Sequence, residues 1–363
     1  MATPVPFPVA SEPAPADRWD EVLCRLVDAI GRGPRTVVVD GAAGSDWFAD
    51  RLADALRAVG QECARLSDRT PEHDEDAWSQ EAGPSAVALA DGPRWRAHPV
   101  GRAWDVVIWL RAGSTDAAGA DARSAAEHPA DAGVVIDLND PSWPVIRHID
   151  AALLPPDAWH LAETRAFFAP RAATWDTKFG DDLPAYRQAV RQSGVRAGST
   201  VLDLGCGTGR ALDAMRDAVG PAGRVVGVDA TVEMLRAAQR LGRADTARLV
   251  LADALRLPLR DNCVDIVFAA GLVDHLPDPV AGLAEIARVT APGGMLVLFH
   301  PSGRAALAAR HGRRLTEDDF LSEGTLRIAL SRTGWILDRY EDPPDHFYAR
   351  ALFLSPAARP ARG

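Results

Sequence analysis

The sequence predicts an α/β protein of two domains, and three observations lead to this expectation. The chain has 363 residues, which exceeds the roughly 100–200 residues of a typical single domain. In both halves, short apolar runs alternate with segments of helical periodicity, a pattern typical of parallel sheets covered by helices. Prolines and turn residues gather in LNDPSWP (138–144) and LLPPD (153–157), and they predict a boundary near Leu154 to Asp157.

The first domain is expected over residues 17–153, after a Pro/Ala-rich disordered tail at 1–16. Apolar and β-branched residues fill its predicted strands, which are 36–40, 63–68, 86–90, 105–110 and 132–137. A helix is expected over Asp46–Val59, and an alanine-rich helix precedes the last strand. Strands that alternate with helices in this way predict a parallel sheet.

The second domain is expected over residues 154–355, with a short tail at 356–363. Its predicted strands are Thr200–Leu204, Arg224–Asp229, Ala247–Leu251, Val264–Ala269, Met295–Phe299, 335–342 and 347–354. Its predicted helices are 183–194, Arg210–Val219, Val232–Leu241, Val280–Val289 and 326–334. A short connection, 343–346 with PPD in it, joins the last two strands. We therefore expect a seven-stranded Rossmann-like sheet with an antiparallel hairpin at its edge.

The net charge and the cysteine spacing indicate which kinds of binding partner the protein has. The formal net charge of −10 and the lack of a basic cluster argue against nucleic acid or a membrane as a partner, and favour a small molecule. The four cysteines lie far apart without metal-ligand spacing, so we expect no metal site and a cytoplasmic location. A homo-oligomer is left open.

The strongest motif is VLDLGCGTGR (201–210), in which Gly205, Gly207 and Gly209 follow a predicted strand and precede a predicted helix. Glycines in this place let the chain turn tightly and let a ligand lie against bare backbone. Two further predicted strands are followed or ended by acids. Asp229 is placed to accept hydrogen bonds from ribose hydroxyls, and Asp253 is placed for an adenine amino group.

These residues resemble the class I S-adenosylmethionine-dependent methyltransferases, and the resemblance extends over roughly Phe167 to Leu354. Other similar stretches are 256–279, EIARVTAPGGMLVLFHP (285–301) and the closing strand pair. The resemblance implies S-adenosyl-L-methionine as the cofactor, a small-molecule acceptor, and a role in transferase chemistry. The segment 167–186 resembles the N-terminal lid of small-molecule members, and we call it the lid segment.

The resemblance assigns each site residue a part of the cofactor. The methionine moiety would be faced by Asp203, Gly205, Cys206, Gly207 and Gly209, and the ribose by Asp229. The adenosine would lie beside Thr231 and Met234, and its adenine would contact Asp253 and Ala254. The sulfonium side would lie near Ala270, Gly271 and His275, and the lid contacts would be Trp175, Asp176 and Tyr186. Cys206 is expected to fill space rather than to act as a nucleophile, since nothing basic adjoins it.

Three side chains are candidates for a general base: His275, Asp274 and His300. Each follows a predicted strand at the carboxyl edge, where ligands bind in open α/β sheets. Packing or capping is the alternative role for the histidines. A base is needed only if the acceptor must lose a proton, because methyl transfer is an in-line displacement that depends mainly on positioning.

Two other readings of this half compete with the enzyme. A nicotinamide-binding Rossmann domain also has a glycine-rich loop, but the spacing here is G-x-G-x-G and the late hairpin favours a methyltransferase. A non-catalytic protein that binds or senses S-adenosylmethionine would use the same residues, so the sequence leaves that alternative open.

The first half resembles the uridine-kinase-like branch of P-loop kinases, over nearly all of residues 34–149. The resemblance is carried by VVVDGAAGSDWFADRLADAL (37–56), 88–113 and HPADAGVVIDLNDPSWPVI (128–146). A phosphate-binding loop reads G-x-x-x-x-G-K-[ST], whereas counting from Gly41 puts Asp46, Trp47 and Phe48 at its last three positions. We therefore expect a degenerate, catalytically inactive kinase-like domain. An active nucleoside or small-molecule kinase is the alternative, which the missing lysine opposes.

Overall fold

The computed structural model describes residues 15–31, 35–42, 44–69, 86–99, 103–111, 129–178, 181–310, 315–317 and 319–354. The described chain forms two compact units that divide between Glu163 and Thr164. We call them the N-terminal and C-terminal units and describe each by itself. The division lies later in the chain than the predicted limit after Leu153. The predicted tails lie outside the described residues, except that Pro15 and Ala16 begin the first helix.

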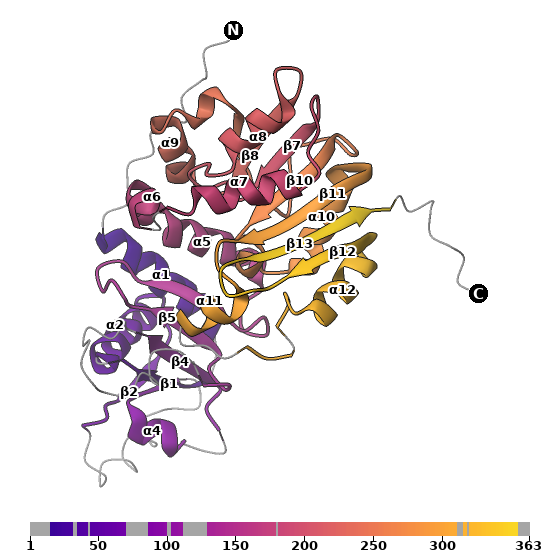
Figure 1. The fold of residues 1–363 in the computed structure, drawn as a ribbon. Coiled ribbons are helices and arrows are strands. Elements are labelled where there is room, and N and C mark those ends of the chain that lie inside the picture. Colours follow the sequence, from indigo (N-terminus) through magenta and orange to yellow (C-terminus); the bar gives the residue numbers. More distant parts are fainter. Residues whose placement is uncertain are drawn as a thin grey trace. The chain divides into compact units, whose positions relative to one another are not determined.

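The N-terminal unit is built on a six-stranded sheet in the order β2-β3-β1-β4-β5-β6 (Figure 1). Its elements are α1 (Pro15–Ile30), β1 (Arg35–Gly41), α2 (Ser45–Ala58), β2 (Cys63–Leu66), β3 (Val87–Asp91), α4 (Pro93–Ala97), β4 (Val106–Arg111), β5 (Val134–Asp137), β6 (Val145–Ile149) and η2 (Pro156–Ala158). The five strands predicted from the sequence are present, and α1, α4 and β6 were missed.

The prediction of a wholly parallel first sheet is wrong in one strand. β6 pairs antiparallel with β5, with Asp137 opposite Val145. Only a short turn separates the two strands, whereas a parallel crossover needs about a dozen residues or more. Pro141 and Pro144 lie in this turn, within the N-terminal unit, and do not mark the domain boundary that the sequence predicts. The predicted alanine-rich helix falls within 112–128 and lies outside the described residues.

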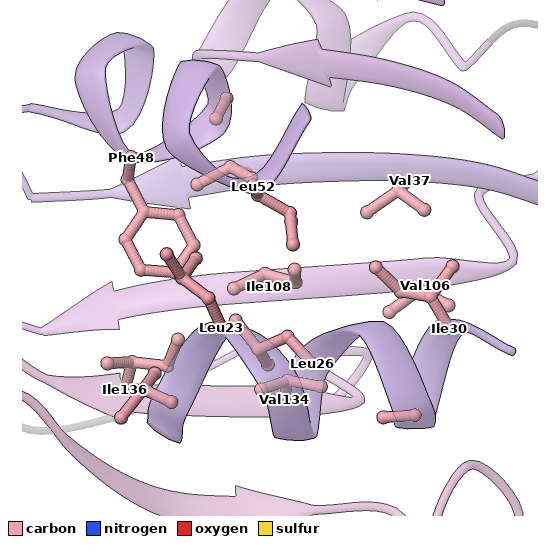
Figure 2. Close-up of a cluster of buried hydrophobic side chains, with 14 of the residues drawn as sticks. Leu23, Leu26, Ile30, Val37, Phe48, Leu52, Val106, Ile108, Val134 and Ile136 are labelled. Carbon is pink, nitrogen blue, oxygen red and sulfur yellow. The ribbon is translucent and has the colours of Figure 1, made fainter. Parts of the chain in front are cut away.

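The core of the N-terminal unit follows from strand alternation. In β1, Val37 and Val39 join one buried cluster and Val38 joins another, because successive side chains point to opposite faces of a sheet. Figure 2 shows the first cluster, in which α1 and α2 direct apolar side chains toward the strands. Phe48 from α2 is fully buried in this cluster, which also contains Leu23 and Ile136.

A buried ion-pair network ties α1 to the end of the unit. Glu163, in α5 (His160–Phe168), is 2% exposed and accepts hydrogen bonds from Arg18 and Arg25, the latter at 2.7 Å. The same carboxylate accepts the backbone N–H of Ile146 at 2.8 Å, and Arg18 Nε donates to the Pro144 carbonyl oxygen at 2.8 Å. Arg18 is only 1% exposed, so the carboxylate of Glu163 is needed to compensate its buried positive charge.

The C-terminal unit contains a seven-stranded sheet in the order β12-β13-β11-β10-β7-β8-β9 (Figure 1). Its strands are β7 (Thr200–Leu204), β8 (Arg224–Asp229), β9 (Arg248–Leu251), β10 (Val264–Ala270), β11 (Thr290–His300), β12 (Trp335–Glu341) and β13 (Phe347–Phe353). Its helices, after α5, are η3 (Ala169–Thr174), α6 (Trp175–Lys178), α7 (Leu183–Gln192), α8 (Leu212–Val219), α9 (Val232–Arg240), η4 (Arg243–Asp245), η5 (Val273–His275), α10 (Pro279–Val289), α11 (Arg304–Arg310) and α12 (Glu323–Arg332).

The predicted edge hairpin is confirmed, because β12 and β13 pair antiparallel and β13 also pairs antiparallel with β11. Helices cover both faces of this sheet. Along β10, Ile266 and Phe268 pack in the cluster that contains α7 and α8, whereas Val267 and Ala269 pack in the cluster with α10 and α12. The carboxyl ends of the parallel strands therefore form one edge, where the loops after β7, β8, β10 and β11 gather.

No helix within the described part of the chain is long and apolar enough to span a membrane. The same residues contain no group of three or more His, Cys, Asp or Glu side chains that could hold a metal ion.

Candidate functional site

The glycine loop after β7 is held against the end of β8 by backbone hydrogen bonds. Gly205 and Cys206 both donate their N–H groups to the Val228 carbonyl oxygen, at 2.8 and 2.9 Å. Gly205, Gly207 and Gly209 have φ angles of 72°, 55° and 83°, in the left-handed region that favours glycine. A Cβ atom added to Gly207 would meet no atom of the described residues within 4 Å apart from its chain neighbours, so this face of the loop borders open space.

Asp229 joins this loop to the next helix. One oxygen of its carboxylate accepts the Gly207 N–H at 2.8 Å, and the other accepts the Thr231 N–H at 2.7 Å. Thr231 is the N-cap residue of α9 and is 1% exposed. Burial raises the pKa of Asp229, and the backbone hydrogen bonds oppose this shift. Because a carboxylate oxygen can accept more than one hydrogen bond, Asp229 retains capacity for hydroxyl donors.

Asp203 lies one residue before the end of β7 and is 2% exposed. Burial raises its pKa to about 8, and the nearby negative charge of Asp229 adds to the shift. Burial likewise raises the pKa of Cys206, so this thiol remains protonated and is no nucleophile. Cys206 is 7% exposed, and its space-filling role stays a prediction.

Of the residues predicted beside the adenosine, some lie in the loops at the carboxyl ends of the strands and others are buried in the core. The backbone N–H of Ala252 donates to the Asp229 carbonyl oxygen at 3.0 Å, which brings the segment after β9 to the end of β8. Asp253 accepts the Leu255 N–H at 2.9 Å, and Ala254 is buried in the core. Met234 is 2% exposed and packs with Trp175 in a small apolar cluster, so α9 and the lid segment cover its side chain.

The lid segment is attached to the glycine loop by charged side chains. Asp176 accepts a hydrogen bond from the Thr208 hydroxyl and pairs with Arg243 at 2.7 Å. Arg243 also donates to the Thr208 carbonyl oxygen at 2.7 Å, and Arg210 of the loop pairs with Asp182 of the lid. Burial alone would raise the pKa of Asp176, but the bonds from Thr208 and Arg243 lower it overall. We call these contacts the lid clamp.

Tyr186 contacts the site from α7. Its ring packs edge-on against Phe299 of β11, with ring centroids 5.1 Å apart, and Arg210 lies 5.8 Å from its ring centroid. Burial strongly raises the pKa of the phenol, so the hydroxyl remains protonated.

The three candidate bases do not lie together in one environment. His275 packs edge-on against Phe168, with ring centroids 5.0 Å apart, and lies 6.4 Å from the Phe167 ring. Asp274 is exposed beside it. His300 ends β11, and its Nδ1 lies 3.0 Å from the Ser302 carbonyl oxygen and 3.1 Å from the Ser302 backbone nitrogen.

His300 has the clearest electrostatic setting of the three. Burial lowers its pKa, and Arg310 adds to this shift while the Ser302 contact opposes it, so the imidazole is neutral near pH 7. When Nδ1–H donates to the Ser302 carbonyl oxygen, Nε2 of the neutral imidazole is unprotonated and can accept a proton from a ligand.

A pocket lies at the carboxyl ends of β10 and β11, and we call it the β10–β11 pocket. It is a small pocket of about 30 Å³ that opens to solvent. Its lining is mostly apolar and consists of Ala269, Gly271, Leu272, Val273, Asp274, Leu298, Phe299, His300, Ser302, Arg304, Leu307, Leu315, Asp319, Leu321 and Phe347. A Cβ atom at Gly205 would lie 3.0 Å from Leu272 Cδ1, so the pocket adjoins the glycine loop.

The pocket separates the predicted residues into two groups. Asp274, His300 and Gly271 line it, whereas His275 is not part of its lining. Gly271 donates its N–H to the Phe299 carbonyl oxygen at 2.9 Å, which fixes the turn after Ala270. Sequence reasoning missed two further groups, namely the arginines of the lid clamp and the Arg304 and Asp319 side chains of the pocket. Arginine is abundant in this chain, so no local pattern distinguished the buried ones.

Comparisons with known proteins cover part of the chain. Residues 202–298 match the family described as Methyltransferase domain. An uncharacterized 37.1 kDa protein in transposon TN4556 of Streptomyces fradiae is 40% identical over 107 residues, which are 29% of this chain and 31% of that protein. Demethylmenaquinone methyltransferase of Staphylococcus aureus is 37% identical over 117 residues, which are 32% of this chain and 48% of that protein. The chain thus spans less than half the length of these relatives.

Among solved structures, a SAM-dependent methyltransferase from Aquifex aeolicus superposes with a TM-score of 0.41 at 22% identity, over 53% of this chain and 98% of that chain. The family match extends from β7 to β11, the region that holds the glycine loop and Asp229. Residues 202–298 of the C-terminal unit are therefore similar to the methyltransferase domain family.

Proposed function

We propose that the protein transfers a methyl group from S-adenosyl-L-methionine to a small-molecule acceptor bound in the β10–β11 pocket. The observation that carries this proposal is the pair of hydrogen bonds by which Asp229 holds both Gly207 and Thr231. They fix a bare backbone surface beside open space, next to a carboxylate that can bind ribose hydroxyls. The residues present therefore fit the cofactor.

S-adenosyl-L-methionine supplies an electrophilic methyl group when bound. The chain's own residues then have mainly to position the acceptor, because in-line displacement is accelerated by holding the reacting atoms at near-attack distance. His300 is the best placed of the three candidates to take a proton from an acceptor, since its imidazole is neutral, half-buried and in the pocket lining. Asp274 is exposed, and the aromatic contacts of His275 favour a packing role.

Turnover separates an enzyme from a binding protein. The full chain would be incubated with S-adenosylmethionine and a metabolite extract, and S-adenosylhomocysteine would be measured. Cofactor binding with no product above an extract-free control would favour the non-catalytic alternative. A cytoplasmic location and a small-molecule partner are parts of the same proposal.

Replacing Asp229 with asparagine is expected to weaken S-adenosylmethionine binding by about 1–3 kcal/mol, because charge-assisted hydrogen bonds become neutral ones and one oxygen becomes a donor. Calorimetry on the full chain would measure the change. Asp217→Asn on the exposed side of α8 is the matched control, and it should bind as the unmodified protein does. Equal affinities of the two variants would remove Asp229 from the cofactor site.

We further propose that the N-terminal unit is a kinase-like domain without phosphoryl-transfer activity. Phe48, at the position of the hydroxyl in a phosphate-binding loop, is fully buried in the core. Trp47, at the lysine position, packs edge-on against Trp19 with ring centroids 5.0 Å apart. Asp46 pairs with Arg69 at 3.1 Å and adds negative charge where phosphates need positive potential.

This unit is expected to hydrolyse neither ATP nor GTP with magnesium, because it lacks the lysine and the magnesium-binding hydroxyl. Phosphate release from the purified full chain would be compared with a buffer control. Release above the control that disappears in the Asp46→Arg variant would contradict the proposal, since contaminating activity would not respond to that substitution.

A further inference from the structure

The imidazole of His300 is held by the protein on one side of its ring. Its Nδ1 lies 3.0 Å from the Ser302 carbonyl oxygen and 3.1 Å from the Ser302 backbone nitrogen. Its Nε2 forms no hydrogen bond with any residue that the structure describes. A Cβ atom built on Gly271 would lie 3.7 Å from Cδ2, the ring atom bonded to Nε2, and Gly271 lines the β10–β11 pocket. The ring therefore has its Nε2 edge on the side of Gly271 and its Nδ1 edge against Ser302.

Ser302 is in turn held by Arg310. The Arg310 Nη2 donates a hydrogen bond to the Ser302 hydroxyl oxygen at 3.1 Å, and Ser302 is 8% exposed. Arg310 is the last residue of α11. The next residue of the turn, Gly303, donates its N–H to the Pro344 carbonyl oxygen at 3.0 Å, and a Cβ atom there would lie 1.9 Å from the Pro343 carbonyl oxygen. The turn that holds the imidazole is therefore fixed by close backbone packing and by one arginine side chain.

The positive charge of Arg310 also acts on His300. Burial is the main cause of the lowered pKa of His300, and Arg310 lowers this pKa further, whereas the Ser302 contact opposes both effects. The other charged or titratable groups on the elements around the ring are Asp274, Arg304, Asp319, Tyr340, Asp342 and His346. Arg304 lies 3.0 Å from Asp319 and 3.4 Å from Asp342, and His346 lies 3.3 Å from Glu341. Arg310 is therefore the charged side chain that we expect to control the titration of His300.

We propose that Ser302 and Arg310 are positioning residues that hold the His300 ring with its proton on Nδ1, so that Nε2 can take the proton that an acceptor loses on methylation. This inference rests on the proposed function, and it adds two residues that act on the reaction through His300. It assigns no contact with the acceptor to either of them.

The proton transfer needs only the ring and these two neighbours. Nε2 takes the proton as the acceptor's bond to hydrogen breaks and its bond to the methyl carbon forms, while the electron pair of the broken carbon–sulfur bond stays on sulfur. The resulting imidazolium keeps its Nδ1–H on the Ser302 carbonyl oxygen. The charge of Arg310 disfavours this imidazolium, so the proton passes on to water and the neutral base is restored.

The position of the proton on His300 can be measured without any acceptor. The full chain would be prepared with isotope-labelled histidine, and nitrogen NMR signals of His300 would be assigned by their loss in the His300→Gln variant. In the neutral ring we expect the chemical shift of a protonated nitrogen at Nδ1 and that of an unprotonated nitrogen at Nε2. Free histidine favours the opposite tautomer, so this result would report on the contact with Ser302.

The Arg310→Gln variant should move the titration of His300 to higher pH, because it removes a positive charge that lowers the pKa of the ring. It should also reduce the share of the Nδ1–H tautomer, because Ser302 loses its hydrogen-bond donor. Ser302→Ala keeps the backbone carbonyl but removes the hydroxyl, so it should cause the same loss of this tautomer. Adding Arg310→Gln to Ser302→Ala should then cause no further loss. Arg310→Lys keeps the charge and should titrate close to the unmodified protein.

Arg332→Gln is the matched control, because Arg332 ends α12, is exposed and does not line the pocket. Turnover of S-adenosylmethionine with the metabolite extract would also be followed against pH, and the acidic limb of the Arg310→Gln profile should lie at higher pH. The inference would be overturned by a proton on Nε2 in the neutral ring of the unmodified protein, by unchanged His300 signals in folded Arg310 and Ser302 variants, or by a pH profile that does not follow the titration of His300. A lack of S-adenosylhomocysteine formation by the unmodified protein would instead overturn the proposed function, because the NMR signals are measured without turnover.

Discussion

Replacing Glu163 with glutamine is expected to destabilise the N-terminal unit by about 3–5 kcal/mol, because it breaks a buried ion pair by removing one partner. Glu163 is 2% exposed and Arg18 is 1% exposed, so the variant leaves a guanidinium charge in the interior without its buried carboxylate. The side chains keep their size, so the loss would come from charge rather than from a cavity. Hydrogen exchange of the amides in α1 and β6, measured on the full chain, reports on this unit specifically.

The chain supplies a matched control for this variant. Glu21 also pairs with Arg18, at 2.9 Å, but its side chain is 48% exposed. Exposed ion pairs contribute about 0–1 kcal/mol, so Glu21→Gln should leave the exchange rates almost unchanged. Similar protection in both variants would show that the Glu163 network contributes little to stability.

Replacing Gly207 with valine is expected to reduce S-adenosylmethionine affinity at least about a hundredfold, or about 2.7 kcal/mol. The side chain would enter the open space beside the loop, which is where the proposed function places the cofactor. Since a Cβ atom there meets no protein atom within 4 Å, the folded structure has room for the substitution. Its φ of 55° adds strain of about 1–2 kcal/mol, which a melting curve would reveal.

Gly194→Val is the control that distinguishes backbone strain from steric blocking of the cofactor by the new side chain. Gly194 has a φ of 89° and also has no protein atom within 4 Å of an added Cβ, but it lies in the turn between α7 and β7, at the opposite end of that strand. This variant should lose comparable stability and keep its cofactor affinity. Normal binding by a folded Gly207→Val protein would mean that the loop does not hold the cofactor.

Much of the fold could be predicted because its signals are local. β7 and β8 end where the sequence predicted, since apolar runs stop at a glycine loop and at an acidic strand end. β6 was missed because prolines and aspartates dominate the turn before it, and only its pairing with β5 makes Val145–Ile149 a strand. The compact units likewise divide after Glu163 rather than after Leu153, because Leu153 and Trp159 pack in the N-terminal core.

The sequence predicts those candidate site residues whose role depends on backbone conformation or on their position at a strand end. Glycines with left-handed φ and acids at strand ends leave a pattern in sequence, so Gly207 and Asp229 could be named in advance. The pairing of Arg304 with Asp319 and Asp342 depends on three segments that meet only in the folded chain. A histidine likewise shows nothing in sequence of its surroundings, and so His275 and His300 could be told apart only from their contacts.

A lysine suitable for fluorescent labelling lies next to the lid clamp. The sequence contains a single lysine, Lys178, which is the last residue of α6 and lies two positions after Asp176. Its side chain is exposed, whereas the neighbouring Asp176 holds Thr208 and Arg243. Lys178 is therefore the one side-chain amine for an amine-reactive fluorophore, and a free α-amino group of the chain would have to be blocked first. The emission of the fluorophore should follow, in real time, any loosening of α6 from the glycine loop as ligands enter and leave.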